Sequence, residues 1–225
     1  MTVILLRHGR STSNVAHTLA GRSEGIDLDD KGREQAQTIV ERIGSLPVKA
    51  IVRSPLLRCE NTVAPLAAAL DLDVLVDERL SEVDYGEWTG RKIGELFKEP
   101  LWAVVQQHPS AAVFPGGEGL AQVQGRAVEA IRAHDRRLAE ENDGDVLWVA
   151  CTHGDVIKSV VADALGTHLD SFQRITADPA SMSVIRYTSV RPFVMHVNHT
   201  GAALTAALSA KPEPTEDAVV GGSTD

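Results

Sequence analysis

The fold is decided by the stretch from Val3 to Gly9, which reads Val-Ile-Leu-Leu-Arg-His-Gly. Four apolar residues followed by polar residues and a glycine are typical of a buried strand that ends in a loop. In open α/β sheets, ligands bind just beyond the carboxyl ends of such strands. The loop that begins at Arg7 is therefore the first candidate for a functional site.

Strands and helices alternate along the rest of the chain. Short apolar runs predict further strands at 50–52, 74–76 and 146–150. Apolar residues at helical spacing predict helices at 32–45, 54–70, 118–141 and 155–165, with a less regular one over 93–107. This order predicts an α/β protein with a mainly parallel sheet that is covered by helices on both faces.

Local signals define some of the ends of these elements. Ser54 and Pro55 are expected to be the N-cap and the first residue of their helix, and Gly166 is expected to end the helix that precedes it. The β-rich runs 182–187 and 193–197 are close enough in sequence to pair as a hairpin.

The length and composition favour one globular domain. The chain has 225 residues, 43% hydrophobic and 24% charged, which is ordinary for a folded protein. We expect one domain over residues 1–205, with two small domains as the weaker interpretation of the same length. Residues 206–225 are rich in proline, glycine and polar residues, and we expect them to form a disordered tail.

Charge and hydropathy narrow the function classes. The formal net charge is −9, which opposes non-specific binding to nucleic acid or to an anionic membrane surface. No signal peptide or membrane-spanning run is recognisable, and two cysteines do not suggest a disulfide framework. The expectation is a cytoplasmic enzyme, with no nucleic acid and no membrane as partner. A homodimer is one candidate state. An anionic substrate would need a local basic pocket in this acidic protein.

Candidate groups for such a pocket follow several strands. His8-Gly9 has a counterpart in His153-Gly154, again after a predicted buried strand and before a helix. Arg7 and Arg58 offer planar donor groups suited to phosphate oxygens, and the carboxylate of Glu82 follows a third strand. From the residues alone, His8 could be a base, a ligand or a nucleophile. Gly9 is expected to let a ligand approach the backbone closely.

A longer series of motifs carries a family resemblance. The series comprises Arg7-His8-Gly9, Gly21, Leu28-x-x-x-Gly32-x-x-Gln35-Ala36, Ser54-Pro55-Leu56-Leu57-Arg58 with Thr62, Glu82 with Tyr85-Gly86-Glu87-Trp88-Thr89-Gly90, Pro115-Gly116-Gly117-Glu118 and His153-Gly154. In this order, over roughly residues 1–200, the chain resembles the histidine phosphatase superfamily, also called phosphoglycerate-mutase-like. Within it, the chain is similar to an actinobacterial group of phosphomutase-like and phosphatase-like members.

The resemblance implies a fold and a set of roles. The implied fold is a three-layer α/β sandwich whose mostly parallel sheet has one antiparallel edge strand. His8 corresponds to the nucleophile that takes the phosphoryl group, and Glu82 to the general acid and base. The phosphate-binding groups would be Arg7, Asn14, Arg58 and His153. The implied reaction uses a small phosphorylated metabolite, with no metal and no cofactor, because arginines supply the positive charge.

Three functions remain open at this level: a phosphatase, a phosphoglycerate-type phosphomutase and a non-catalytic phosphate-binding module. The segment from Gly90 to Pro115 has few cations and no arginine pair, which favours hydrolysis over isomerisation. Arg10, unusual at its position for the family, is either a cation at the pocket rim or a solvated surface residue. The cysteines are expected to be buried and inert. His196 and His199 are expected to have structural roles rather than to bind a metal, and Arg132, Arg136 and Arg137 are expected to form a solvated helix face rather than a binding patch.

Overall fold

The computed structural model describes residues 1–43 and 45–201, so the predicted tail at 206–225 lies outside the described residues. Six strands form one sheet in the order β3-β2-β4-β1-β5-β6. They are β1 (Thr2–Arg7), β2 (Val48–Arg53), β3 (Val74–Val76), β4 (Leu147–Thr152), β5 (Met182–Tyr187) and β6 (Pro192–His199). The first four are mutually parallel, and β5 runs antiparallel both to β1 and to its hairpin partner β6.

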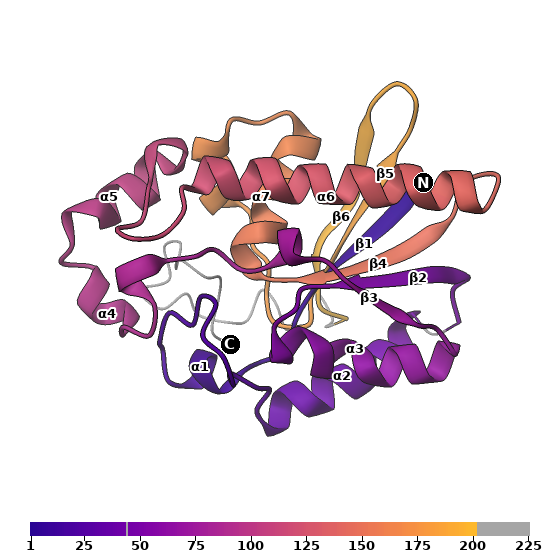
Figure 1. Cartoon of the computed structure of the whole chain (residues 1–225), viewed down its shortest axis with the longest axis horizontal. Coiled ribbons are helices and arrows are strands. Elements are labelled where there is room, and N and C mark those ends of the chain that lie inside the picture. The colour runs from indigo at the N-terminus through magenta and orange to yellow at the C-terminus, as the bar shows by residue number, and fades with distance from the viewer. Residues whose placement is uncertain (44, 202–225) are drawn as a thin grey trace.

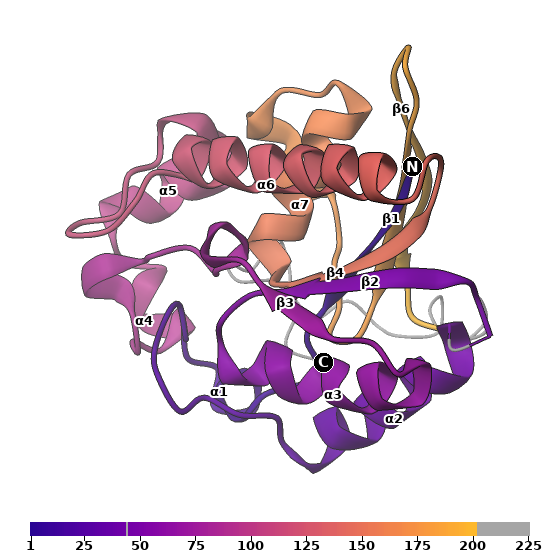
Figure 2. The same ribbon diagram turned by 45° about the vertical axis from the view of Figure 1, so that its right-hand side comes forward.

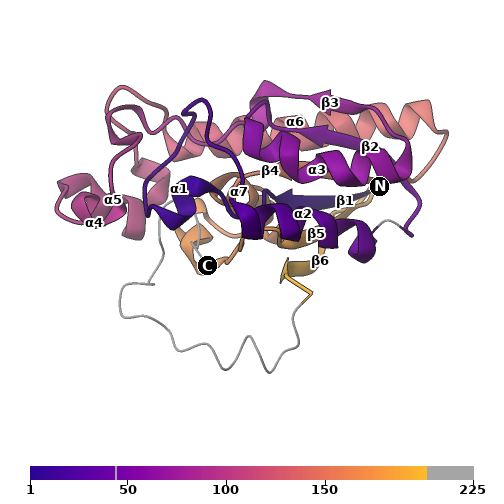
Figure 3. The same cartoon turned by 90° about the horizontal axis from the view of Figure 1, so that it is seen from below.

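Helices cover both faces of the sheet, as the sequence predicts. They are α1 (Thr12–Val15), α2 (Asp30–Ile43), α3 (Leu57–Leu70), α4 (Ile93–Leu96), α5 (Pro100–Gln107), α6 (Leu120–Glu141) and α7 (Gly154–Leu165). Short 3-10 helices are η1 (Glu78–Leu80), η2 (Gly86–Trp88), η3 (Pro109–Ala111) and η4 (Leu169–Arg174). In Figure 1, α6 and α7 lie above the sheet and α2 and α3 below it, and Figures 2 and 3 show the same layers from other sides.

The two faces of the sheet build two hydrophobic cores because side chains alternate along a strand. In β1, Val3 and Leu5 point into the core between the sheet and helices α6 and α7, whereas Ile4 and Leu6 point into the core between the sheet and helices α2 and α3. All four side chains are at most 3% exposed. The apolar run that opens the chain therefore belongs to a strand that is buried on both faces, which is typical of parallel sheets.

The register of the parallel strands brings the candidate site residues together at the carboxyl ends of these strands. Arg7 pairs with Thr152, and Arg53 pairs with Cys151. The residues that follow these strand ends, His8, Ser54 and His153, therefore leave the sheet at the same level.

Several element ends differ from the sequence prediction. The helix expected from Ser54 begins later, with Leu56 at the N-cap position, and the helix expected over 93–107 is divided into α4 and α5. The antiparallel strand β5 lies one position inside the sheet, and its hairpin partner β6 forms the edge. The left-handed Gly166 (φ +67°) ends α7 as predicted.

No helix in the described part of the chain is long and apolar enough to span a membrane.

Gly9 has a structural role that the sequence did not indicate. A Cβ atom on Gly9 would lie 2.7 Å from the carbonyl oxygen of Gly32, and one on Gly32 would lie 2.0 Å from that of Arg10. The missing side chains thus allow the start of α2 to pack against the loop after β1. The close approach that the structure shows is between two backbone segments, and the approach of a ligand to Gly9 stays a prediction.

Candidate active site

His8 follows β1 directly, and its hydrogen bonds define its tautomer. Its Nδ1 lies 2.7 Å from the carbonyl oxygen of Gly9, which can only accept, so Nδ1 carries the proton. Nε2 is then the atom with the free electron pair, and it accepts a hydrogen bond from Nε of Arg58 at 3.3 Å. The ring is 4% exposed. Nε2 is therefore the atom of His8 that can attack an electrophile.

The electrostatics of the site keep this imidazole neutral. Burial, followed by the positive charges of Arg58 and Arg7, lowers the pKa of His8 well below 6.5 and outweighs the opposing hydrogen bond to Gly9. An unprotonated imidazole at neutral pH is the form that a nucleophile requires.

Two buried arginines flank His8. Arg7, at the end of β1, donates from Nη1 to the carbonyl oxygen of Ala177 at 2.7 Å. Arg58, in the first turn of α3, donates from Nη2 to the carbonyl oxygen of Gly21 at 2.8 Å. Its Nη1 is buried and has no hydrogen-bond partner among the described residues. Burial of an unsatisfied cationic donor is costly in a native protein, and an anionic ligand would relieve that cost.

Thr62 fixes the geometry between α3 and the His8 loop. Its hydroxyl donates to the carbonyl oxygen of Arg58 at 2.6 Å and accepts from the N–H of Gly9 at 2.9 Å. This hydroxyl joins the helix that carries one site arginine to the loop that carries the histidine.

His153 is the N-cap residue of α7 and is completely buried. Its ring centroid lies 5.2 Å from that of His8, and its Nε2 lies 2.7 Å from the hydroxyl oxygen of Ser54. The Nδ1 atom has no partner among residues 1–43 and 45–201. Burial, then the charge of Arg58, lowers its pKa well below 6.5. Ser54, which the sequence assigns to a helix cap, instead orients this ring.

Glu82 lies just after η1 and is 4% exposed. Its Oε1 accepts a hydrogen bond from the N–H of Val83 at 2.9 Å. Burial, and then the negative charge of Asp155, raise the pKa of Glu82 from 4.5 to about 7, although Val83 and Arg58 act in the opposite direction. A carboxyl group with this pKa can both give and take a proton near neutral pH.

Asn14 and Arg10 have different positions relative to the site. Asn14 lies in α1 and lines the pocket, and its Oδ1 accepts from the N–H and hydroxyl of Ser11, which leaves its amide nitrogen as the available donor side. Arg10 is ion-paired with Asp29 at 2.6 Å and is not among the pocket-lining residues. The rim-cation interpretation of Arg10 therefore has no support in the described structure.

The pocket has a volume of about 380 Å³, part of it open to solvent. Five of the predicted site residues line it, namely Arg7, His8, Asn14, Arg58 and Glu82. His153 does not line it; its side chain is completely buried and lies next to Ser54 and His8. Other walls come from Ser11, Ser13, Thr18, Leu19, Ala20, Gly21, Tyr85 and Ile93.

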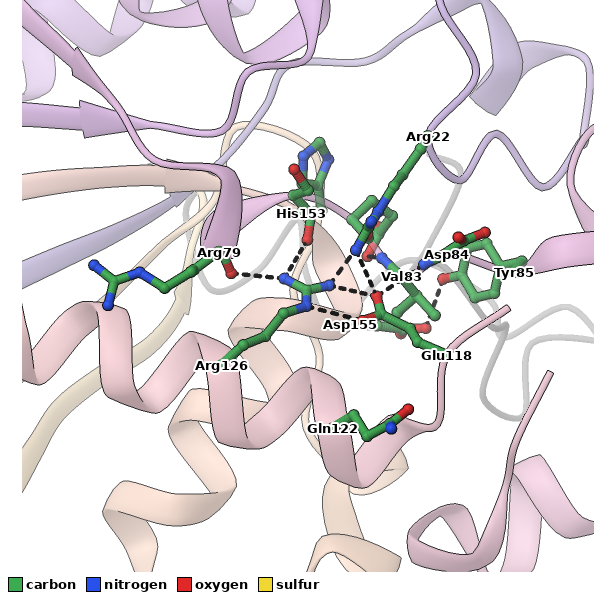
Figure 4. Close-up of polar contacts among 12 residues, drawn as sticks. Arg22, Arg79, Val83, Asp84, Tyr85, Glu118, Gln122, Arg126, His153 and Asp155 are labelled. Atoms are coloured by element: carbon green, nitrogen blue, oxygen red, sulfur yellow. Dashed lines mark hydrogen bonds and ion pairs between the residues drawn. The ribbon is translucent and has the colours of Figure 1, made fainter. Parts of the chain in front are cut away.

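Several residues around the site were missed by sequence reasoning. Tyr85 donates its hydroxyl hydrogen to Oδ2 of the completely buried Asp155 at 2.8 Å. Figure 4 shows a second group, in which Arg126 of α6 and Arg22 contact Glu118. Tyr85 and Glu118 belong to the motifs quoted above, but Arg126 lies in a helix with no motif around it. Among the described residues, no group of three or more His, Cys, Asp or Glu is arranged to hold a metal ion.

Comparisons with known proteins identify the family of this chain. The sequence pattern of the histidine phosphatase superfamily (branch 1) matches residues 3–200, and the chain belongs to this family of enzymes. Phosphoserine phosphatase 1 of Hydrogenobacter thermophilus is 28% identical over 88% of this chain and 92% of its own length. The probable phosphoglycerate mutase GpmB of Proteus mirabilis is 30% identical over 83% and 85%.

Solved structures agree in fold. Bacillus stearothermophilus YhfR superposes with a TM-score of 0.80 at 26% identity, covering 88% of this chain and 96% of its own. Mycobacterial glucosyl-3-phosphoglycerate phosphatase, solved with VO3, gives a TM-score of 0.79 at 25% identity, with coverage of 88% and 98%.

Proposed function

We propose that this enzyme is a metal-independent phosphatase that hydrolyses small organic phosphate monoesters through a phosphohistidine at His8. The observation that carries the proposal is the buried, unprotonated Nε2 of His8 beside two cationic arginines, in a pocket that also contains a carboxyl group with a pKa of about 7. These are a nucleophile, a phosphate-binding charge and a proton donor in one site.

The first step transfers the phosphoryl group to the enzyme. The electron pair on Nε2 of His8 forms a bond to phosphorus while the bond from phosphorus to the ester oxygen breaks. Protonated Glu82 gives its proton to that oxygen, which leaves as an alcohol. Arg7 and Arg58 stabilise the negative charge on the remaining phosphoryl oxygens, which is the main requirement of this transition state.

The second step releases phosphate. Glu82, now a carboxylate, takes a proton from water as the water oxygen bonds to phosphorus and the bond from phosphorus to Nε2 breaks. Orthophosphate leaves, and Glu82 is again protonated. One carboxyl group thus serves both steps, which its pKa near neutrality permits.

The second candidate function is a phosphoglycerate-type mutase, because one similar protein bears that name. A mutase must bind a carboxylate beside the phosphate and must exclude water from the phosphohistidine. In the segment from Gly90 to Pro115, Arg91 is ion-paired with Glu99 at 2.7 Å, and Lys92 is exposed and does not line the pocket. These contacts favour water over a second substrate hydroxyl as the phosphoryl acceptor.

Phosphate release from a panel of small phosphate monoesters tests the proposal. The wild-type enzyme is expected to act in the presence of EDTA, and the His8→Ala variant should be folded but inactive on every compound. Arg10→Gln is a matched control, because Arg10 lies two residues away but is paired with Asp29 outside the pocket. A requirement for added metal, or full activity in His8→Ala, contradicts the mechanism.

A separate assay discriminates between hydrolysis and isomerisation. With 3-phosphoglycerate and a 2,3-bisphosphoglycerate primer, free phosphate should appear at least as fast as 2-phosphoglycerate. Accumulation of 2-phosphoglycerate many times faster than phosphate would show that the enzyme is a mutase.

A further inference from the structure

The main chain that carries Glu82 is held by side chains rather than by a strand or an α-helix. Arg126, which points inward from α6, donates from Nη1 to the carbonyl oxygens of Arg79 at 2.6 Å and Ser81 at 2.8 Å. Its Nη2 donates to the carbonyl oxygen of Glu82 at 3.2 Å. One guanidinium group therefore fixes three carbonyl groups in four consecutive residues (Figure 4).

Glu118 binds both Arg126 and the main chain that follows Glu82. It accepts from Nε of Arg126 at 3.1 Å and from Nη2 at 2.7 Å, and its Oε1 also accepts from the N–H of Asp84 at 2.9 Å. Burial would raise the pKa of Glu118, but the hydrogen bonds from Arg126 and from the Asp84 N–H outweigh it and lower the pKa below 4.5. Glu118 is thus an ionised partner that orients Arg126 and holds the chain just beyond Glu82.

Arg22 connects the same segment to the wall of the pocket. It donates from Nε to the carbonyl oxygen of Glu82 at 2.9 Å and from Nη2 to Oε1 of Glu118 at 2.8 Å. Its neighbour Gly21 lines the pocket and accepts from the phosphate-binding candidate Arg58. The carbonyl group of Glu82 is consequently contacted by two arginines, Arg126 from α6 and Arg22 from the segment beside the pocket-lining Gly21.

This arrangement matters for the carboxyl group of Glu82 because the carboxyl is tied to its own main chain. Its Oε1 accepts from the N–H of the next residue, Val83, so the carboxyl moves with the backbone of 82–83. A shift of about 1 Å in a catalytic group can reduce a rate by roughly 100-fold. We propose that Arg126, Glu118 and Arg22 form a positioning network that fixes the backbone of Glu82 and thereby directs its carboxyl group at the leaving oxygen.

This inference rests on the proposed role of Glu82 as general acid, and leaving-group dependence tests both. A general acid matters most for alkyl phosphates, whose leaving oxygen needs a proton, and least for activated aryl phosphates. Arg126→Gln should reduce kcat/KM for an alkyl phosphate by roughly 10- to 100-fold and change it by less than about threefold for an aryl phosphate. Arg126→Lys should recover only part of the loss, because one ammonium group cannot replace the planar guanidinium.

Two other arginines provide a control variant and a milder variant. Arg132→Gln alters another arginine of α6, ion-paired with Asp163 and 49% exposed, and should leave both substrates unaffected. Arg22→Gln removes a 40%-exposed side chain and one hydrogen bond to Glu82, so it keeps the test open if Arg126→Gln does not fold. Arg22→Gln should show the same selective loss to a smaller extent.

A double-mutant cycle with Glu82→Gln decides whether the network acts through Glu82. On the alkyl phosphate, Arg126→Gln should cause less than about a threefold further loss once Glu82 is Gln. An equal proportional loss in both backgrounds, or a loss equal on both substrates, would overturn the positioning role while leaving Glu82 as the acid. If Glu82→Gln itself lowers kcat/KM equally for both substrates, the proposed mechanism fails, and this inference fails with it.

Discussion

Replacing Glu82 by Gln should make the protein more stable at alkaline pH. Burial, and then Asp155, raise the pKa of Glu82 from 4.5 to about 7 in the folded protein. Because the folded-state pKa is the higher one, the favourable contribution of this group is complete below pH 4.5 and is lost as the pH rises through 7. Above that pH the folded protein contains a buried carboxylate, whereas Gln stays neutral.

The magnitude follows from the two pKa values. A difference between 4.5 and about 7 corresponds, at about 1.4 kcal/mol per pKa unit, to about 3 kcal/mol of unfolding free energy. For a domain of this size, 1 kcal/mol changes Tm by roughly 2–4 °C, so the variant should melt about 6–12 °C above the wild type at pH 8. At pH 5 the difference should be much smaller.

Thermal unfolding of both proteins between pH 5 and pH 8 measures this difference. The buffers must contain no phosphate, because a ligand that binds the folded state would raise Tm by itself. The change of the Tm difference with pH carries the test, since a fixed offset from the amide group cancels. Glu118→Gln is a control of opposite sign, because the pKa of Glu118 is lowered in the folded state and its carboxylate is stabilising at neutral pH. A Tm difference that does not grow with pH would refute the raised pKa of Glu82.

Three further predictions concern activity and stability. For an alkyl phosphate, kcat/KM should fall above an apparent pKa near 7 in the wild type but not in Glu82→Gln, and persistence of this alkaline fall in the variant would assign it to another group. His8 should cause no fall of kcat/KM on the acid side near pH 6.5, because its pKa is well below that value. Ser54→Ala should weaken inhibition by orthophosphate roughly tenfold, because it removes the 2.7 Å contact to Nε2 of His153; unchanged inhibition would mean that this contact does not orient the ring for phosphate. Asp77→Asn should destabilise the protein at pH 7, because hydrogen bonds from Arg79 and His134 outweigh burial and lower the pKa of Asp77 from 3.8 to about 2. In urea unfolding, the destabilisation should disappear as the pH falls from about 4 towards 2. A destabilisation that is equally large at pH 7 and pH 2 contradicts the ion pair.

The parts of the site that sequence could predict are those that follow strands. His8 and His153 leave two neighbouring parallel strands, and the register Arg7–Thr152 makes their proximity a consequence of the sheet. Glu82 and Arg58 could be named because their motifs occur in the right order. The hairpin of β5 and β6 was predictable for a similar reason, since its two runs are close in sequence.

The parts that sequence could not predict depend on contacts between distant elements. A Ser-Pro pair is an ordinary helix start, and only the pairing of β2 with β4 in the register Arg53–Cys151 places the Ser54 hydroxyl next to His153. Arg126 lies 44 residues after Glu82 in the same helix as Arg132, and nothing in the local pattern separates the inward-facing arginine from the exposed one. The pKa of Glu82 likewise depends on Asp155, which reaches it only through the folded chain.

The measurement that tests the central claim most directly is the capture of the phosphoenzyme. Rapid quenching of the enzyme with a ³²P-labelled phosphate monoester should leave label in an acid-labile, base-stable linkage, and peptide mapping should locate it at His8. With an activated aryl phosphate, whose leaving oxygen needs little protonation in the first step, the trapped amount should increase in Glu82→Gln, because that variant has no base to activate water for the second step. Turnover without any labelled histidine, or label located on another residue, would contradict the proposed nucleophile.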